Sequence, residues 1–162
     1  MRKKILLITL AILIIIQFIR PARNISSGES ANDISKVYAV PAPVKQILDV
    51  SCNDCHSNNT RYPWYTNIQP VGWWMQWHVN EGKQGLNFSE FAKYTPKRQH
   101  HKLEETVEQV REGEMPLNSY LWIHKEAKLS QEQKDLLINW AEELREKIKK
   151  DNNLPEEPER QH

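Results

Sequence analysis

The feature that most constrains this chain is a cluster of three potential ligand residues within five positions. Cys52 and Cys55 are its only cysteines, and His56 follows the second at once. On a helix these side chains fall at i, i+3 and i+4, so all three face the same side. The apolar spacing of Val44, Ile47, Leu48 and Val50 just before them favours such a helix. One flat ligand can therefore meet both thiols and the imidazole.

The spacing Cys-x-x-Cys-His is the sequence signal for covalent attachment of c-type haem. Two thiols can add to the two vinyl groups of a haem, while the adjacent imidazole binds the iron as proximal ligand. Three other uses remain open. A structural zinc site needs a second ligand pair, a thioredoxin-like dithiol needs a βαβ context, and a disulfide across these helical positions would be strained. We predict one haem c, held by Cys52, Cys55 and His56.

The iron then needs a second axial ligand for electron transfer, or an open position for small-molecule chemistry. Met115 is the leading candidate, because Gly113-Glu114-Met115-Pro116 follows a predicted helix end and can fold over the far face of a haem. The alternative for this methionine is to fill a gap in the core. His78 is the runner-up distal ligand, followed by His124, whereas His100 and His101 are expected in solvent.

Six tryptophans are many for 162 residues, and four follow soon after the haem motif. The four are Trp64, Trp73, Trp74 and Trp77. Large aromatic rings can wall a porphyrin and exclude water, so we predict cofactor contacts for them, although each could equally be an ordinary core residue. We also expect the carbonyl of Pro63 or Pro70 to accept the second ring N–H of His56.

The N-terminus is typical of a membrane-targeting segment. Met1-Arg2-Lys3-Lys4 precedes an almost wholly apolar stretch, residues 5–19. As a helix with a rise of ~1.5 Å per residue this stretch covers about 22 Å, short of a ~30 Å hydrocarbon core, so length does not separate a signal peptide from a short anchor. Because the cleavage pattern after Ile19 is weak, we favour an anchor in the cytoplasmic membrane. Either way the remainder would be delivered to the periplasm.

The pattern along the chain predicts an all-α fold without repeats or strands. Helices are expected near residues 44–56, 70–82, 87–91, 95–112 and 130–150, with an irregular stretch at 114–129. The predicted organisation is a signal or anchor segment (1–23), a flexible tether (24–42), a haem-binding domain (43–150) and a polar tail (151–162).

The charge distribution bears on possible partners. Residues 1–23 carry five Lys or Arg and no acid, whereas the rest carries 17 basic and 21 acidic residues, a formal charge of −4. A mildly acidic body does not suit nucleic acid, which requires a basic face. With only five glycines and neither GxGxxG nor GxxxxGK, nucleotide chemistry is not indicated either.

The order of the motifs resembles the bacterial haem-binding domain family, small one-haem domains akin to class I c-type cytochromes. The resemblance covers about residues 40–148. It implies a cytochrome c-like fold in which the first and last helices cross near the haem edge and the Met-Pro pair is distal. The segments that carry it are the CxxCH motif, Pro63-Trp64-Tyr65, Pro70-Val71-Gly72-Trp73-Trp74, His78-Val79, Leu86-Asn87-Phe88-Ser89, Gly113-Glu114-Met115-Pro116 and Tyr120-Leu121-Trp122-Ile123-His124.

The combined prediction is a membrane-tethered, extracytoplasmic monohaem cytochrome that passes single electrons and performs no bond chemistry. We expect a monomer that docks transiently on basic patches of redox partner proteins in the cell envelope, with binding weakened by salt. Two other functions stay open. One is a haem-based sensor or ligand-binding module with a weak or empty sixth position. The other is a peroxidase-like enzyme, for which Glu114 is the only suggestive distal group.

Overall fold

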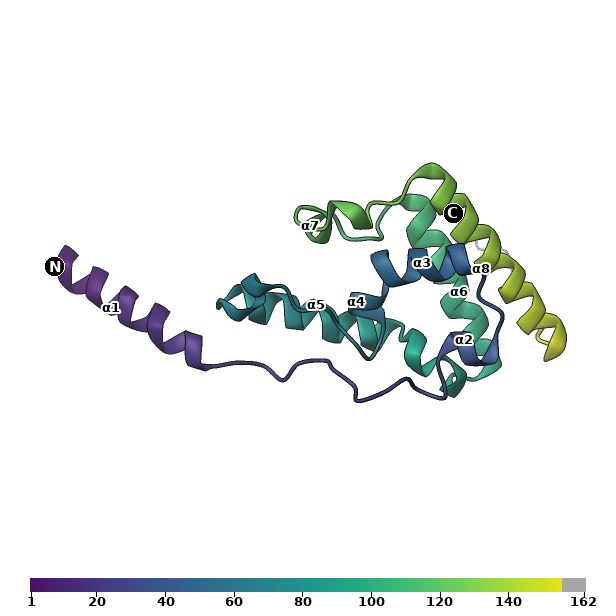
Figure 1. Cartoon of the computed structure of the whole chain (residues 1–162), viewed down its shortest axis with the longest axis horizontal. Helices are drawn as coiled ribbons and strands as arrows, with labels where there is room; N and C mark the ends of the chain where they lie inside the picture. The colour runs from purple at the N-terminus through teal and green to yellow at the C-terminus, as the bar shows by residue number, and fades with distance from the viewer. Residues whose placement is uncertain (156–162) are drawn as a thin grey trace.

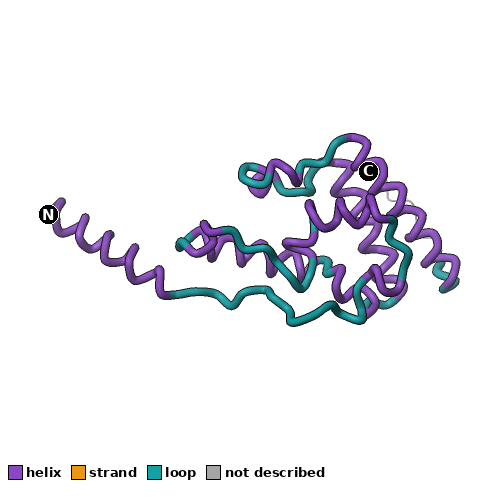
Figure 2. The backbone as a smooth tube through the Cα atoms, viewed as in Figure 1, coloured by secondary structure: helices purple, strands orange, loops and turns teal. Residues whose placement is uncertain are grey.

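The computed structural model describes residues 1–155, and within this range every regular element is a helix (Figure 2). The predicted all-α fold is therefore confirmed. The elements in order are α1 (Arg2–Ile15), η1 (Ile16–Phe18), α2 (Ile34–Val37), α3 (Ala42–Ser51), α4 (Asn53–His56), η2 (Trp64–Asn67), α5 (Val71–Gly85), η3 (Phe88–Lys93), α6 (Pro96–Glu112), α7 (Asn118–Leu121), η4 (Lys125–Ala127) and α8 (Gln131–Asp151).

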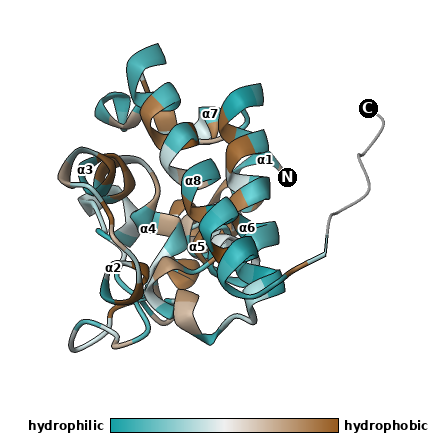
Figure 3. Ribbon diagram, turned by 90° about the vertical axis from the view of Figure 1, so that its right-hand side faces the viewer, coloured by the Kyte–Doolittle hydropathy of each residue, from teal (hydrophilic) through white to brown (hydrophobic). Residues whose placement is uncertain are grey.

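The hydrophobic core forms where α6 packs along α8 and where α3 packs against α8 (Figure 1). Each helix contributes apolar residues spaced three or four apart, so one stripe faces the core and the other sides stay polar. Figure 3 shows these hydrophobic stretches on otherwise hydrophilic helices. The main core side chains are Val44, Ile47 and Leu48 on α3, Leu103, Val107 and Val110 on α6, and Leu137, Trp140, Leu144 and Ile148 on α8.

The ends of the two long helices follow their sequence signals. The hydroxyl of Thr95 accepts a hydrogen bond from Arg98 N–H at the start of α6, and Gly113 ends that helix in the left-handed region with φ of +79°. Ser130 and Gln133 form a capping box at the start of α8. These polar partners satisfy backbone groups that a helix end leaves unpaired.

Helix α5 is longer than predicted: it continues past residue 82 to Gly85. It is also only partly covered, because Trp74 and Trp77 are about half exposed. Gly82 does not break the helix; it permits close packing against another segment, as described below. An apolar pattern reports what a helix could bury, whereas the neighbouring elements decide which sides are covered.

Residues 24–42, expected as a flexible tether, instead pack on the domain. Asn24 donates from its side chain to the Ser57 carbonyl at 2.9 Å, and the Asn32 carbonyl accepts from Ala92 N–H at 3.0 Å. Ile34, on α2, belongs to the core and is only 3% exposed. The polar composition of the segment gave no sign of these contacts, so in the structure the segment is packed and not a free linker.

The apolar N-terminal segment forms α1 and η1. Helix α1 extends away from the rest of the molecule (Figure 1), whereas Gln17 on η1 hydrogen-bonds to Gln69. Helix α1 buries none of its residues, and its large apolar side chains are exposed on all sides. Among residues 1–155, no helix is both long enough and apolar enough to cross a membrane. The polar tail predicted for residues 151–162 begins with the last residue of α8, and residues 156–162 lie outside the described part of the chain.

Candidate haem site

A cavity of about 350 Å³ opens beside the CxxCH motif. Cys52, Cys55 and His56 line one part of it, so the structure brings the three predicted residues to one site. The remaining wall comes from α5, from one side of α6 and from the segment between α6 and α7. The lining residues used below are Trp77, His78, Gly82, Gly85, Leu86, Lys102, Glu105, Gln109, Met115 and Tyr120.

The orientation of His56 is set by a backbone carbonyl. Its Nδ1 lies 3.0 Å from the Leu86 oxygen, and since a carbonyl only accepts, Nδ1 must carry the proton and donate. Burial lowers the pKa of His56, which favours the neutral ring. The lone pair is then on Nε2, the tautomer in which an imidazole can bind a metal.

The acceptor for His56 differs from the one expected. The Pro63 carbonyl accepts from Thr66, through its N–H at 3.1 Å and its hydroxyl at 2.6 Å, and the Pro70 carbonyl accepts from Trp74 N–H at 3.1 Å. Both are engaged in local turns. Leu86, 30 residues beyond His56, follows the end of α5, and its position depends on how α5 packs against α4.

Both cysteines are free thiols beside the cavity. Burial raises the pKa of Cys52 to about 12 and the pKa of Cys55 to about 11. Each therefore stays protonated at neutral pH and is a poor nucleophile or metal ligand in this state, because the thiolate is the reactive form. This state does not suit a redox dithiol, whose attacking thiol must be partly ionised.

Gly82 allows α5 to lie directly against the motif. A β-carbon at this position would lie 2.8 Å from the Cys55 carbonyl oxygen and 2.9 Å from the Cys55 Cβ. Both distances are shorter than normal van der Waals contact, and the first atom belongs to the backbone, which cannot rotate away. Glycine is therefore required here for the packing that also brings Leu86 to His56.

Replacing Gly82 by alanine is expected to destabilise the domain. Overpacking costs about 1–3 kcal/mol, and the better helix propensity of alanine returns about 0.5–1 kcal/mol, so we expect a net loss of about 1–2 kcal/mol. Chemical denaturation followed by circular dichroism measures the difference. Gly85→Ala is the matched control on the same helix, because a β-carbon there meets no protein atom within 4 Å. Equal stability of the two variants would contradict the close-packing argument.

A buried carboxylate inside the motif, which also lines the cavity, binds two neighbouring side chains. Asp54, between the two cysteines, is 5% exposed and accepts hydrogen bonds from Arg61 Nε at 3.0 Å and from the Tyr120 hydroxyl at 2.7 Å. Burial, together with the bond to this carboxylate, raises the pKa of Tyr120, so the phenol stays protonated and donates. The pair ties α4 to α7, and Tyr120 in turn stacks on His124 with ring centroids 4.3 Å apart.

Met115 follows the end of α6 by three residues and lines the cavity. Gly113 stops α6, and the N–H groups of Glu114 and Met115 both donate to the Gln109 carbonyl, at 3.0 and 3.2 Å. The chain is therefore turned back on the helix end, and Met115 lines the cavity as predicted for a distal residue. His78 lines the same cavity, while its Nδ1 lies 2.9 Å from the Trp74 carbonyl.

The other predicted site residues are only partly brought together. Of the four tryptophans, Trp77 lines the cavity, whereas Trp64, Trp73 and Trp74 do not, and neither does Pro70. Trp64 is instead 75% exposed. The structure therefore does not bring these four residues to the cavity, because they lie at the start of α5 and in the preceding turn.

The remaining histidines also depart from expectation. His100 is buried, because it lies on the side of α6 that faces the core, and is not in solvent. His101 is partly exposed and pairs with Glu104 and Glu105. His124 Nε2 lies 2.6 Å from the Tyr65 hydroxyl oxygen, and His124 does not line the cavity.

A family model described as a haem-binding domain matches residues 11–143. The chain belongs to the haem-binding domain family. No match was found among curated proteins or among solved structures. The matched range contains the CxxCH motif, Met115 and every element that lines the cavity.

The site fits the cofactor of this haem-binding domain. The volume lies in the range of small-molecule and cofactor pockets, about 300–1,000 Å³, and the donor set offers two thiols, an imidazole with Nε2 available and a thioether. Cys52 and Cys55 would hold the porphyrin, His56 would bind the iron, and Met115 or His78 could supply a further ligand. A bound haem supplies an iron that gains and loses one electron. Among residues 1–155, no group of three or more His, Cys, Asp and Glu is arranged to hold a metal ion directly.

Several functional positions were not identified by sequence reasoning. Asp54 lies inside the motif and carried no recognisable signal of its own, and Gly82 was interpreted as a helix stop. Tyr120 belongs to one of the segments on which the family resemblance rests, but only the structure links its hydroxyl to Asp54. The polar wall contributed by Lys102, Glu105 and Gln109 was also missed, because helical spacing does not show which polar side faces a cavity.

Proposed function

We propose that this haem-binding domain is a monohaem c-type cytochrome that carries single electrons, with thioether bonds to Cys52 and Cys55 and axial ligation by His56 and Met115. The observation that carries the proposal is the shared cavity of these four residues. The hydrogen bond from His56 Nδ1 to Leu86 supports it, because that bond orients the imidazole for a metal and makes it more basic.

In such a function the protein positions the haem and sets its reduction potential. Cys52 and Cys55 retain the group, Asp54 and Tyr120 hold the motif against α7, and Met115 favours the ferrous state as a soft neutral ligand. Under this proposal no residue makes or breaks a bond in a substrate. The outer face of the cavity, where Trp77 is half exposed, is the side at which a redox partner could approach.

We also place the domain outside the cytoplasmic membrane, attached through residues 1–19. Two observations support this location: the exposed apolar surface of α1, and a CxxCH motif whose covalent haem requires export. Because residues 24–42 pack on the domain, attachment would hold the domain close to the lipid surface and not on a free tether.

The test is to express the full chain with an export route and haem maturation machinery and to titrate its reduction. We expect a single one-electron transition and a low-spin spectrum that carbon monoxide does not change, since both axial positions would be filled. A high-spin spectrum that shifts with carbon monoxide would instead favour a ligand-binding or peroxidase-like module.

That second candidate has one observation in its favour. Lys102, Glu105 and Gln109 bring polar groups into the cavity wall on α6, and such groups could contact a small ligand bound at an open iron. Lys102 and Glu105 are, however, paired with each other at 2.5 Å. The carbon monoxide result decides between the two functions.

A further inference from the structure

Large apolar side chains gather in the exposed surface at one end of the domain. We call this surface the aromatic end; its members are Trp64, Ile68, Val71, Trp74, Trp122 and Ile123. All are at least 39% exposed, and Trp64 and Trp122 are about three-quarters exposed. None of the six lines the cavity. Such a concentration of exposed apolar area in one region marks an interaction surface.

The aromatic end combines segments that are far apart in the sequence. The Tyr65 hydroxyl, on η2, lies 2.6 Å from His124 Nε2, which brings Trp64 and Trp122 to the same end of the molecule although they are far apart in sequence. Helix α5 starts directly after η2 and adds Val71 and Trp74. The Tyr65–His124 contact is partly buried, and it joins η2 to the segment that follows α7.

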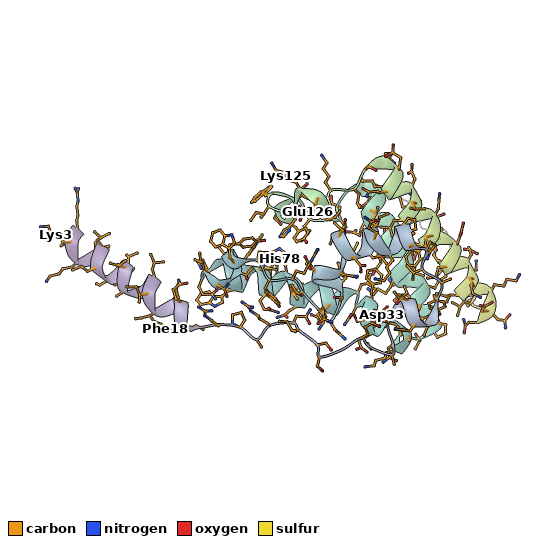
Figure 4. The ribbon with its side chains drawn as sticks, in the orientation of Figure 1. Lys3, Phe18, Asp33, His78, Lys125 and Glu126 are labelled. Atoms are coloured by element: carbon orange, nitrogen blue, oxygen red, sulfur yellow. The ribbon has the colours of Figure 1, made fainter. Side chains whose placement is uncertain are left out.

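The apolar N-terminal segment is attached at this same end. Gln17 donates from its side-chain amide to the Gln69 carbonyl at 3.1 Å and accepts from Gln69 N–H at 2.9 Å. Trp73 Nε1 donates to the Ile19 carbonyl at 2.7 Å. Three hydrogen bonds therefore fix the end of η1 beside the start of α5, and Figure 4 shows Phe18 on that side of the domain, whereas Asp33 lies toward the opposite end.

The charges around the aromatic end suit a lipid surface. Arg20 and Arg23 follow the apolar segment directly, Arg23 being held by Asn67 at 2.6 Å. Lys125 follows Trp122 and Ile123, with Glu126 as the neighbouring acid (Figure 4). Tryptophan beside Lys or Arg is the pattern found where a membrane protein meets the lipid headgroups.

We propose that the aromatic end inserts into the headgroup region of a phospholipid bilayer, next to the membrane-bound segment α1–η1. The inference rests on the membrane attachment proposed above and extends it. The domain would lie on the bilayer with residues 64–74 and 122–123 embedded in the headgroups. Helix α8 would face away from the lipid. The cavity beside α4 would then have a defined height and direction relative to the membrane.

The experiment uses the full haem-loaded chain in phospholipid nanodiscs that contain a lipid with a photoactivatable diazirine at the level of the glycerol backbone. After illumination, mass spectrometry of the peptides locates lipid adducts. We expect adducts at residues 5–18, at residues 64–74 and at residues 122–123. Val37 and Leu136 are exposed apolar residues on α2 and α8, away from the aromatic end, and should carry several-fold fewer adducts.

The variant Trp64→Ser with Trp122→Ser should reduce labelling at residues 64–74 and 122–123 several-fold and leave residues 5–18 unchanged. Val37→Ser with Leu136→Ser is the matched control and should change none of the three. Adducts at residues 5–18 alone would overturn the insertion and leave this surface to a protein partner, while the membrane attachment would stand. An absence of adducts in every peptide would overturn both, and equal labelling at Val37 and Leu136 would overturn a defined orientation.

Discussion

A chain with Cys52→Ser and Cys55→Ser is expected to lose its acid-resistant haem, with yields lower by about tenfold or more, because no thiol remains to form a thioether. Each single variant retains one attachment point and should keep part of the pigment. Haem is measured after extraction of the purified, exported protein with acidified organic solvent. The extraction removes haem that is bound by coordination alone and leaves haem that is bound through sulfur.

The control for this experiment lies within the same motif. Asn53→Ala removes a hydrogen bond from the Asn53 amide to Asp49 at 2.8 Å but keeps both thiols and His56. It should retain acid-resistant haem near the level of the natural chain. If the natural chain itself released all its pigment into the solvent, covalent attachment would be wrong, although binding of haem by the family domain would stand.

The second large effect is expected from Met115→Ala. Removing the thioether would open the sixth position, so the ferric protein should lose the long-wavelength absorption band of a methionine–iron bond and become high-spin. The ferrous protein should then bind carbon monoxide. The reduction potential should fall by on the order of 0.1 V, a modest part of the ~0.8 V range that axial ligands set. Optical spectra and a redox titration measure these changes.

Two further variants test whether Met115 alone is the distal ligand. Met75→Ala removes the other internal methionine, which lies on α5 but does not line the cavity, and should leave the spectra unchanged. His78→Ala removes the rival ligand, which does line it. A spectral change with His78→Ala and none with Met115→Ala would transfer the distal role to the histidine.

The local features of the fold could be predicted from the residues themselves. Thr95 and Gly113 bound α6 as expected, and Ser130 begins α8, because caps act over one helical turn and depend on nearby residues only. Cys52, Cys55 and His56 lie beside one cavity as their spacing suggested, although the expected helix is broken at Cys52, which caps α4. Met115 also lines this cavity, since a residue just beyond a helix end can turn back over it; its role as distal ligand stays a prediction.

Features that depend on contacts between distant segments could not be predicted in this way. The carbonyl that orients His56 belongs to Leu86, and its selection requires α5 to lie against α4 at the separation that Gly82 permits. The exposure of Trp64 and Trp74 likewise depends on which elements cover η2 and α5. Hydrophobicity shows that a side chain favours burial but does not provide a neighbour to bury it.

The residues alone determined that this chain is helical, that it carries a haem motif and that an apolar segment precedes the domain, because each of these depends on periodicity or on spacing within a few residues. Only the tertiary structure decided which carbonyl holds His56, that residues 24–42 pack on the domain, and that the tryptophans gather beside the N-terminal segment. Those outcomes depend on hydrogen bonds and close contacts between segments far apart in sequence, whose strength is set by the distance and burial that packing produces.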